Sequence, residues 1–277
     1  MNGSEMDTST GILLGVIQGL AEFLPISSSG HLVIFQNLLG FREPELVLDS
    51  ALHFGTLLAV FIYFRSDLKC MIMDSWKFGL DVWGHKKKFK EIHDSPHASL
   101  ALWVLVGTIP TALIGVVFRS SLEEFFGSVT AVGMMLVFTG ILLAFTKPIS
   151  NVYGNRENLN LYIALAVGVC QGLAIIPGIS RSGATIVCGM LCKLRRDVAA
   201  RFSFLLSIPA ITGALVIQLS STGFERVGVT TLLFGVIVSA LVGLFALKIL
   251  MGMVTKGRLF YFAPYCWLLG LAAMMMS

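Results

Sequence analysis

Two short segments of the chain carry most of the residues that could do chemistry. The first runs from Gly15 to Gly30 and is followed by His31, and the second runs from Gly168 to Gly183. Both place hydroxyl side chains and glycine around a proline-containing turn, and each adds a charge, Glu22 in the first and Arg181 in the second. Phosphoryl transfer needs such groups for charge neutralisation, nucleophilic attack and proton transfer.

The two segments are copies of one another. At an offset of 153, GVIQGLAEFLPISSSG pairs without gaps with GVCQGLAIIPGISRSG, and ten of sixteen positions are identical. Chance does not give this match, so the chain contains an internal duplication. Three expected membrane spans separate the copies, which makes the repeat an inverted one. We expect a single domain over 1–277 with inverted repeats at about 11–146 and 161–276.

The composition predicts a membrane protein. Of 277 residues, 56% are apolar and 13% are charged, with a mean hydropathy of +0.84. Soluble domains carry about 25% charged residues, so an ordinary soluble domain is excluded. A net charge of +4 is too small to indicate nucleic-acid binding. Six apolar stretches could span a bilayer, at 46–64, 99–118, 129–146, 203–219, 229–250 and 259–276.

Two further apolar stretches are interrupted and favour re-entrant hairpins. They cover roughly 11–38 and 161–191, and they turn at Pro25 and at Pro177-Gly178 before clusters of Ser and Gly. Such interrupted helices are tolerated at membrane depth only where protein or a water-filled cavity surrounds them. The predicted fold is therefore an all-α polytopic membrane protein with about six transmembrane helices and two re-entrant helical hairpins.

The distribution of basic residues predicts the orientation. With the amino terminus outside, the inside segments 65–98, 147–160, 193–201 and 248–258 hold sixteen Lys and Arg residues, against Arg42, Arg119 and Arg226 outside. Cytoplasmic loops are enriched in these residues. A model with eight spanning helices would place 193–201 opposite 147–160, which the charge distribution disfavours. Both termini are then expected on the outer face.

Ionisable residues at membrane depth indicate an internal polar chamber. Each charge at the bilayer centre costs about 2.5–3.5 kcal/mol, so Glu22, Asp49 and Arg181 must face one another, a cavity or a ligand. Inverted hairpins meet near the midplane. We expect their tips to bring together nine residues, namely Glu22, Ser27, Ser28, Ser29, His31, Ser180, Arg181, Ser182 and Thr185.

The chamber is suited to a pyrophosphate. Gln18 and Glu22 are four residues apart, so both can point oxygens toward a cation or a water. Helices that restart after each Ser/Gly turn direct backbone amides at an anion. Arg181 adds a guanidinium, which binds phosphate oxygens in a forked geometry.

Structural alternatives stay open for each group. Glu22 and Arg181 could form an ion pair that only locks the hairpins together. His31 could bond a backbone carbonyl at the start of a helix, and the Ser runs could serve close helix packing. Asp49 and His53, four residues apart, could support the chamber or have an interfacial role.

Three strings carry a resemblance to a known family. QGLAEFLPISSSGH (Gln18 to His31), PGISRSGAT (Pro177 to Thr185) and FSFLLSIPA (Phe202 to Ala210) resemble signature regions of the bacterial undecaprenyl-pyrophosphate phosphatases, integral membrane proteins associated with bacitracin resistance. The resemblance extends over nearly the whole chain. It implies hydrolysis of undecaprenyl pyrophosphate to undecaprenyl phosphate and phosphate in the bacterial inner membrane. The outer face that the charge distribution predicts for both termini is then the periplasmic one. This reaction recycles the lipid carrier for peptidoglycan and other envelope polymers.

The resemblance also implies roles for individual residues. Glu22, Ser28, His31 and Arg181 match the residues treated as catalytic. The substrate-binding set it implies is Gln18, Ser27, Ser29, Gly30, Ser180, Ser182, Gly183 and Thr185. The family is described as dependent on a divalent cation, so Mg²⁺ or Ca²⁺ is expected at Glu22 and Gln18. The first position of the family's acidic pair is Glu or Gln, and here it is Gln18.

The sequence leaves alternatives open for the nucleophile, for the function and for the oligomeric state. Ser28, or a water in its place, would attack phosphorus while His31 or Glu22 handles the proton. The rival hypothesis is a transporter or flippase for polyprenyl phosphate that uses the same chamber, since inverted repeats with broken helices are typical of transporters. The expected partners are the polyprenyl pyrophosphate lipid and the membrane, with a homodimer left open and no nucleic acid.

Overall fold

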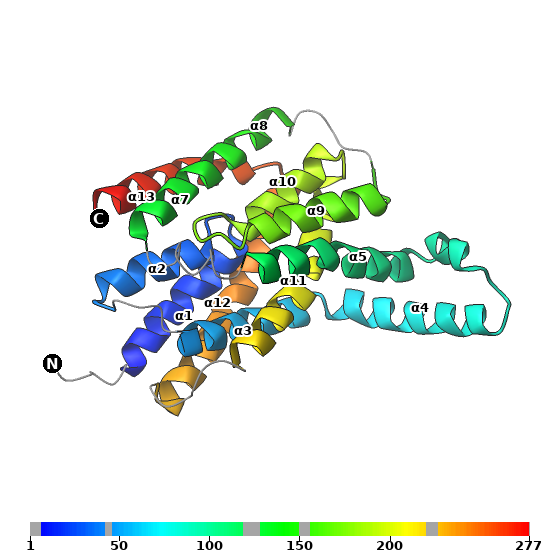
Figure 1. Cartoon of the computed structure of the whole chain (residues 1–277), viewed down its shortest axis with the longest axis horizontal. Helices are drawn as coiled ribbons and strands as arrows, with labels where there is room; N and C mark the ends of the chain where they lie inside the picture. The colour runs from blue at the N-terminus through cyan, green and yellow to red at the C-terminus, as the bar shows by residue number, and fades with distance from the viewer. Residues whose placement is uncertain (1–6, 42–45, 119–127, 150–155, 220–226, 277) are drawn as a thin grey trace.

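The computed structural model describes residues 7–41, 46–118, 128–149, 156–219 and 227–276. These residues form helices and, apart from one isolated bridge between Arg156 and Leu194, no β-structure. The helices are α1 (Thr8–Phe23), α2 (Ser28–Leu38), α3 (Leu46–Tyr63), α4 (Arg65–Trp83), α5 (Pro96–Val117), α7 (Val129–Ala144), α8 (Thr146–Ile149), α9 (Leu161–Leu173), α10 (Arg181–Leu191), α11 (Arg196–Leu219), α12 (Val229–Thr255) and α13 (Ala263–Met275), with 3₁₀ turns η1 (Phe89–Asp94) and η2 (Leu259–Phe262). The all-α prediction is confirmed (Figure 1).

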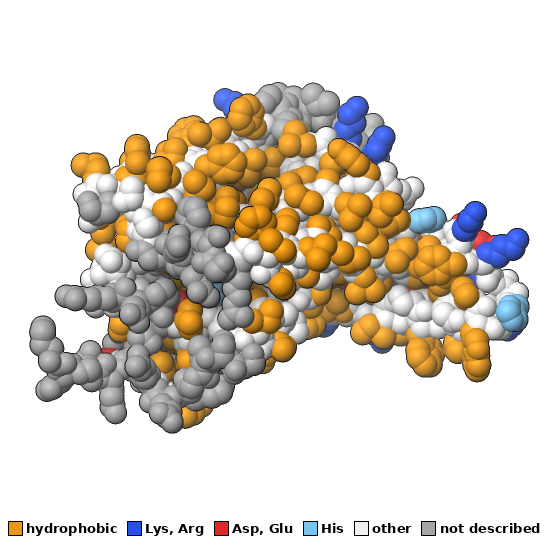
Figure 2. Space-filling model, viewed as in Figure 1, with side chains coloured by type: hydrophobic (Ala, Val, Ile, Leu, Met, Phe, Trp, Pro, Cys, Tyr) orange, Lys and Arg blue, Asp and Glu red, His pale blue; other side chains and the backbone are white. Residues whose placement is uncertain are grey.

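Four helices are long and apolar enough to cross a membrane, namely α3, α5, α11 and α12. The other two expected spans form shorter apolar helices, α7 and η2–α13. Large apolar side chains remain exposed on these helices, among them Leu113, Val116, Phe138 and Leu268. Figure 2 shows such side chains covering one face of the molecule, with Lys and Arg at its margins. The chain is a multi-pass membrane protein.

The helices of the two expected hairpins are too short to span a bilayer. α1 and α2 have 16 and 11 residues, and α9 and α10 have 13 and 11. At 1.5 Å per residue even the longest covers about 24 Å, against a hydrocarbon core of about 30 Å. Each pair turns at the expected proline.

Small residues let the hairpin helices pack closely against long helices. Gly15 of α1 faces Gly235 of α12, where an added Cβ would lie 2.9 Å from the Gly235 carbonyl oxygen. Gly168, the copy of Gly15, faces α5, where an added Cβ would overlap the Gly107 carbonyl oxygen. Without a hydrophobic force between helices in lipid, such close van der Waals packing drives their association. The hairpins are therefore held by backbone-to-backbone contact with α12 and α5.

The four segments that were expected inside contact one another. The Arg156 amide donates to the Lys193 carbonyl at 3.2 Å, and the Arg196 guanidinium donates to the Thr255 carbonyl at 3.4 Å. Arg201 pairs with Asp67 at the start of α4. Arg156 and the segment 193–201 thus lie on the same side, which is incompatible with eight spanning helices. Arg42, Arg119 and Arg226 lie outside the described residues.

The close α9–α5 contact gives a test of the packing. Replacing Gly168 with Ala forces the two helices apart, and overpacking of this kind costs about 1–3 kcal/mol. We expect a lower midpoint of thermal unfolding in detergent for Gly168→Ala. Gly252→Ala is the matched control, because a Cβ at this α12 position meets nothing within 4 Å. Equal unfolding midpoints for the two variants would contradict the packing model.

Candidate active site

The tips of the two hairpins meet. The Ser27 hydroxyl, at the start of α2, accepts a hydrogen bond of 3.1 Å from the Gly178 amide of the second turn. It also accepts the Gly30 amide at 3.3 Å, which caps α2. A Cβ on Gly30 would lie only 3.2 Å from the Gly178 Cα. The turns are therefore in direct contact, as the sequence predicts.

Both turns have unusual backbone geometry. Ser27 has φ +68° and Gly178 has φ +96°, in the left-handed region that costs energy for residues other than glycine. Thr139 of α7 holds the second turn, because its hydroxyl donates to the Gly178 carbonyl at 2.8 Å and accepts the Ser180 amide at 3.1 Å. The strained turn at Ser27 places its hydroxyl where it accepts hydrogen bonds from both hairpins.

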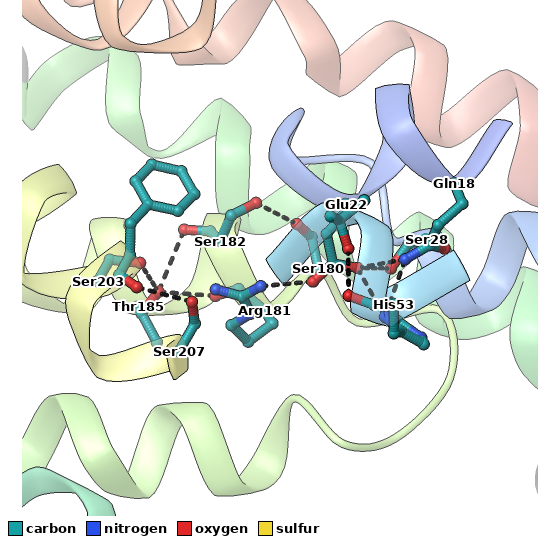
Figure 3. A network of polar contacts seen from close by, with 12 residues as sticks. Gln18, Glu22, Ser28, His53, Ser180, Arg181, Ser182, Thr185, Ser203 and Ser207 are labelled. Carbon is teal, nitrogen blue, oxygen red and sulfur yellow. Dashed lines mark hydrogen bonds and ion pairs between the residues drawn. The ribbon is translucent and has the colours of Figure 1, made fainter. Parts of the chain in front are cut away.

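The Glu22 carboxylate lies at the centre of the site. The Arg181 guanidinium, from the other hairpin, donates to Glu22 Oε1 at 2.5 Å. The Ser28 hydroxyl donates to Glu22 Oε2 at 2.6 Å, and the Gln18 amide donates to the same oxygen at 3.0 Å. Glu22 is buried and Arg181 nearly so. Gln18, Glu22, Ser28 and Arg181 are thus brought together, as expected (Figure 3).

Helices α2 and α10 both have their amino termini at this cluster. Ser27 caps α2, and Ser180 caps α10 by accepting the Gly183 amide at 3.1 Å. The first amides of a helix have no acceptor within the helix, and the helix dipole makes this end positive. The amides of Gly30 and Gly183 donate to the capping serine hydroxyls. The amides of the residues that precede these two glycines in each helix are therefore the ones that could contact an anion. Ser29 and Ser182 lie beside the capping hydroxyls, at 3.4 Å from Ser27 and 3.3 Å from Ser180.

A second group of hydroxyls lies on the other side of Arg181. Thr185 donates to the Arg181 carbonyl at 2.8 Å and hydrogen-bonds the hydroxyl of Ser203 on α11. Ser207, one turn further along α11, is also fully buried. Figure 3 shows Arg181 between this hydroxyl group and the Glu22 cluster. Ser203 and Ser207 were not predicted as site residues, although both fall within FSFLLSIPA.

His31 lies at the hairpin tip, in the first turn of α2. Its Nδ1 lies 2.8 Å from the Ser27 carbonyl oxygen, and its Nε2 lies 2.7 Å from the Tyr265 hydroxyl of α13. The ring also stacks on Tyr265, with centroids 5.7 Å apart. Both ring nitrogens therefore have partners other than Glu22, one of them a carbonyl at the helix start, and the catalytic role expected of His31 stays a prediction.

His53 of α3 occupies the place next to Glu22. Its Nδ1 lies 2.8 Å from the Gln18 amide nitrogen and 3.4 Å from Glu22 Oε2. Asp49, one turn earlier, accepts a hydrogen bond from Gln36 at 2.7 Å. The four-residue spacing of Asp49 and His53 was the signal in the sequence, but it did not say which of the two faces the site.

Two buried polar atoms of the site are left without a hydrogen-bond partner. These are Gln18 Oε1 and Arg181 Nη1. Within the described part of the chain, no three His, Cys, Asp or Glu side chains are grouped to hold a metal ion. Gln18 turns its Nε2 rather than its Oε1 toward the Glu22 carboxylate, so a cation held by both residues would require the amide to turn over. The free guanidinium N–H of Arg181 fits a phosphate oxygen.

The Glu22–Arg181 pair can be tested through stability. Arg181→Met leaves the Glu22 carboxylate buried without its cation, and breaking a buried pair costs about 3–5 kcal/mol. Glu22→Gln combined with Arg181→Met removes both charges and is expected to recover part of this loss in unfolding experiments in detergent. Arg195→Met, at an exposed ion pair with Glu157, should leave the stability nearly unchanged, because solvent screens such a pair. A double variant no more stable than Arg181→Met alone would contradict a buried ion pair.

Comparison with known proteins agrees with this architecture. Residues 11–272 match the model of the family described as bacitracin resistance protein BacA. The chain is 43% identical over 96% of its length to a protein named undecaprenyl-diphosphatase from Desulforapulum autotrophicum, 97% of which is covered. It is 45% identical to one from Halothermothrix orenii, with 96% of each chain covered. A third, from Methanosphaera stadtmanae, is 40% identical over 98% of this chain and 99% of its own length. The chain therefore belongs to the bacitracin resistance protein BacA family.

Proposed function

We propose that this protein hydrolyses undecaprenyl pyrophosphate to undecaprenyl phosphate and inorganic phosphate. The relatives named undecaprenyl-diphosphatase support the substrate and the reaction. The observation that carries the chemistry is the hydrogen bond from the Ser28 hydroxyl to the Glu22 carboxylate, 2.6 Å long. A hydroxyl bonded to a carboxylate is an activated nucleophile beside its base. A transporter has no need of this pair, so hydrolysis is favoured over the transport alternative.

The proposed first step is attack by Ser28 on the terminal phosphorus. A bond forms between Ser28 Oγ and phosphorus, the bond from phosphorus to the bridging oxygen breaks, and the Ser28 proton passes to Glu22. Undecaprenyl phosphate leaves with the bridging oxygen. Glu22 passes its proton to the bridging oxygen of the departing undecaprenyl phosphate. Water then attacks the phosphoserine and loses a proton to Glu22, the bond from phosphorus to Ser28 Oγ breaks, Glu22 returns the proton to Oγ, and inorganic phosphate leaves. His31, bonded to Ser27 and Tyr265, positions the turn that carries Ser28.

Arg181 and the helix termini bind the diphosphate in this proposal. The Nη1 atom of Arg181, which has no hydrogen-bond partner, is available to a phosphate oxygen. The amino termini of α2 and α10 add partial positive charge. Removing such preorganised donors from the developing charge of a transition state typically costs a factor of about 100–1,000 in rate.

A divalent cation, Mg²⁺ or Ca²⁺, is part of the proposal. Gln18 and Glu22 would hold it, through the amide oxygen that has no hydrogen-bond partner and through the carboxylate. When bound, the cation would neutralise charge on the diphosphate. The bond-making and proton-transfer steps themselves are carried out by the side chains of Ser28 and Glu22.

The proposed location is the bacterial inner membrane with both termini periplasmic. The start of α1 and the end of α13 lie at the same end of the molecule (Figure 1). The basic segments that contact one another lie away from that end, as the preference of Lys and Arg for the cytoplasm requires. Recycling of the lipid carrier for cell-wall synthesis, and bacitracin resistance, follow from the reaction. A homodimer stays a hypothesis.

Phosphate release tests the reaction. Purified protein in detergent should release phosphate from undecaprenyl pyrophosphate, and EDTA should suppress the release. Glu22→Gln and Arg181→Ala should each lower the rate by at least about 100-fold. Glu157→Gln and Arg195→Ala, matched changes at an exposed ion pair, should retain the wild-type rate. A folded wild type that releases no phosphate with Mg²⁺ or Ca²⁺ present would refute the proposed function.

Trapping of labelled phosphate tests the nucleophile. Protein quenched in acid during turnover of substrate labelled at the terminal phosphate should carry label on Ser28. Ser28→Ala should lose both label and turnover, whereas Ser29→Ala should still be labelled. Turnover without any label on the wild type, together with retained activity in Ser28→Ala, would instead indicate direct attack by water.

A further inference from the structure

Two hydroxyl groups connect α11 to the backbone of Arg181. The Thr185 hydroxyl, one turn into α10, donates to the Arg181 carbonyl at 2.8 Å, and the Ser182 carbonyl lies further away, at 3.4 Å. The same Thr185 oxygen is hydrogen-bonded to the hydroxyl of Ser203 in α11. Because the Thr185 proton goes to the Arg181 carbonyl, Ser203 is the donor in the second bond. The two bonds therefore run in one direction, from Ser203 to Thr185 to Arg181 (Figure 3).

This link between α10 and α11 is closed to water. Ser203 and Thr185 are both 0% exposed. A bond from a Thr hydroxyl to a carbonyl one turn earlier is common in helices, but a hydroxyl that also accepts from a second helix fixes the two helices relative to one another. Breaking the link leaves a buried polar group unsatisfied. Ser207, one turn later in α11, instead donates to the Phe204 carbonyl of its own helix at 2.7 Å.

The link holds Arg181 at its backbone end. At the other end, Arg181 Nη2 donates to Glu22 Oε1 at 2.5 Å. A planar guanidinium fixed at one nitrogen alone can pivot about that contact, whereas one whose backbone is also fixed directs its remaining N–H groups along a defined line. One of these groups is Nη1, which is buried without a hydrogen-bond partner and which the proposed function assigns to a phosphate oxygen. The direction of Nη1 therefore depends on α11.

The link belongs to the copy of the repeat that carries the guanidinium. At the 153-residue offset, Thr185 corresponds to Leu32 of the first hairpin, which has no hydroxyl. Ser203 corresponds to Ser50 of α3, whose hydroxyl donates to the Leu46 carbonyl of its own helix at 2.7 Å. The turns and their caps are common to both copies, but this link is found with the guanidinium alone.

We propose that Ser203 is a positioning residue for the hydrolysis, acting through Thr185 on Arg181, and that the Thr185 hydroxyl serves this link rather than the substrate. The inference rests on the proposed function and adds a residue of α11 to its site. A group displaced by about 1 Å can lower the rate by about 100-fold. Because Arg181 keeps its charge and its contact with Glu22 when Ser203 is changed, substrate binding should persist and the loss should appear in kcat.

Steady-state phosphate release from undecaprenyl pyrophosphate tests this role. Ser203→Ala should lower kcat by about 10–100-fold and leave KM almost unchanged. Thr185→Val keeps the shape of the side chain and should have the same effect, whereas Thr185→Ser keeps the hydroxyl and should retain most of the rate. Ser239→Ala is the matched control, because this serine of α12 is also 0% exposed and donates to the Val236 carbonyl at 3.1 Å. It should keep the wild-type kcat.

A double variant identifies the residue through which Ser203 acts. In protein that already carries Arg181→Ala, the further change Ser203→Ala should lower the residual kcat by no more than about twofold, since residues that act through one another are not additive. A full loss from Ser203→Ala in this background would show that Ser203 acts on another group, and would overturn the proposal.

Hydrogen exchange in detergent tests the link without any substrate. Without its link to α11, the start of α10 should open more often, so the amides of Arg181–Leu191 should exchange at least about threefold faster in Ser203→Ala than in Ser239→Ala. Thr185→Val should show the same increase, so the result does not depend on one variant. The thermal unfolding midpoints of Ser203→Ala and Ser239→Ala should be close, because each variant loses one buried hydroxyl.

Three further outcomes would overturn the proposal. These are exchange of α10 that is unchanged in both Ser203→Ala and Thr185→Val, a wild-type kcat in folded Ser203→Ala, and equal losses of kcat in Ser203→Ala and Ser239→Ala. Failure of the proposed function has a different signature, which is a folded wild type that releases no phosphate from undecaprenyl pyrophosphate. The exchange measurement decides in that case whether α11 holds the start of α10.

Discussion

The contact between Glu22 and Arg181 is the constraint on which the rest of the site depends. Each charge would be costly at membrane depth if it faced lipid, and each comes from a different hairpin, so the two turns must meet closely for either to be tolerated. The 2.5 Å hydrogen bond between them fixes where the carboxylate points. Because Arg181 occupies Oε1, the other oxygen is left for Ser28, Gln18 and His53. The ion pair thereby orients the carboxylate toward the Ser28 hydroxyl.

The helices that carry this contact cannot anchor themselves, because each is shorter than a bilayer span. Their position comes from close packing against α12 and α5, where glycine removes the side chains that would separate the backbones. The polar groups of the turns add specific links, from Ser27 to Gly178 and from Thr139 to the second turn. Packing thus sets the depth of the hairpins and hydrogen bonds set their register. The site is a product of both.

Most of the architecture could be predicted because lipid imposes few choices. Apolar stretches of sufficient length gave the long helices, and the need to hide Glu22 and Arg181 from lipid predicted that the turns meet. The directions of the two histidines could not be predicted in this way. His31 bonds to Tyr265, 234 residues further along the chain. His53 faces Glu22 because of how α3 rests on α12, where Gly55 lies against Val236 and Ser239. The direction in which a helix turns a side chain depends on packing between distant segments, and the spacing of residues along the sequence does not determine it.

The two copies of the duplicated segment show how one framework came to hold different chemistry. Ser27 and Ser180 are paired by the 153-residue offset and both cap a helix, so the turn itself is shared. Glu22 is paired with Ile175, and Ser28 with Arg181, so the proposed base and nucleophile lie in one copy and the guanidinium in the other.

Gln18 and Gln171 are the sharpest comparison between the copies. Gln171 donates to the Thr111 hydroxyl and the Leu206 carbonyl, each at 3.2 Å, and so ties α9 to α5 and α11. Gln18 instead faces a carboxylate and an imidazole. Gln171, whose neighbour one helical turn later is Ile175, is therefore a structural link. Gln18, whose neighbour one turn later is Glu22, is part of a polar site. Loss of symmetry between the hairpins, rather than the repeat itself, therefore gives the proposed active site its carboxylate on one side and its guanidinium on the other.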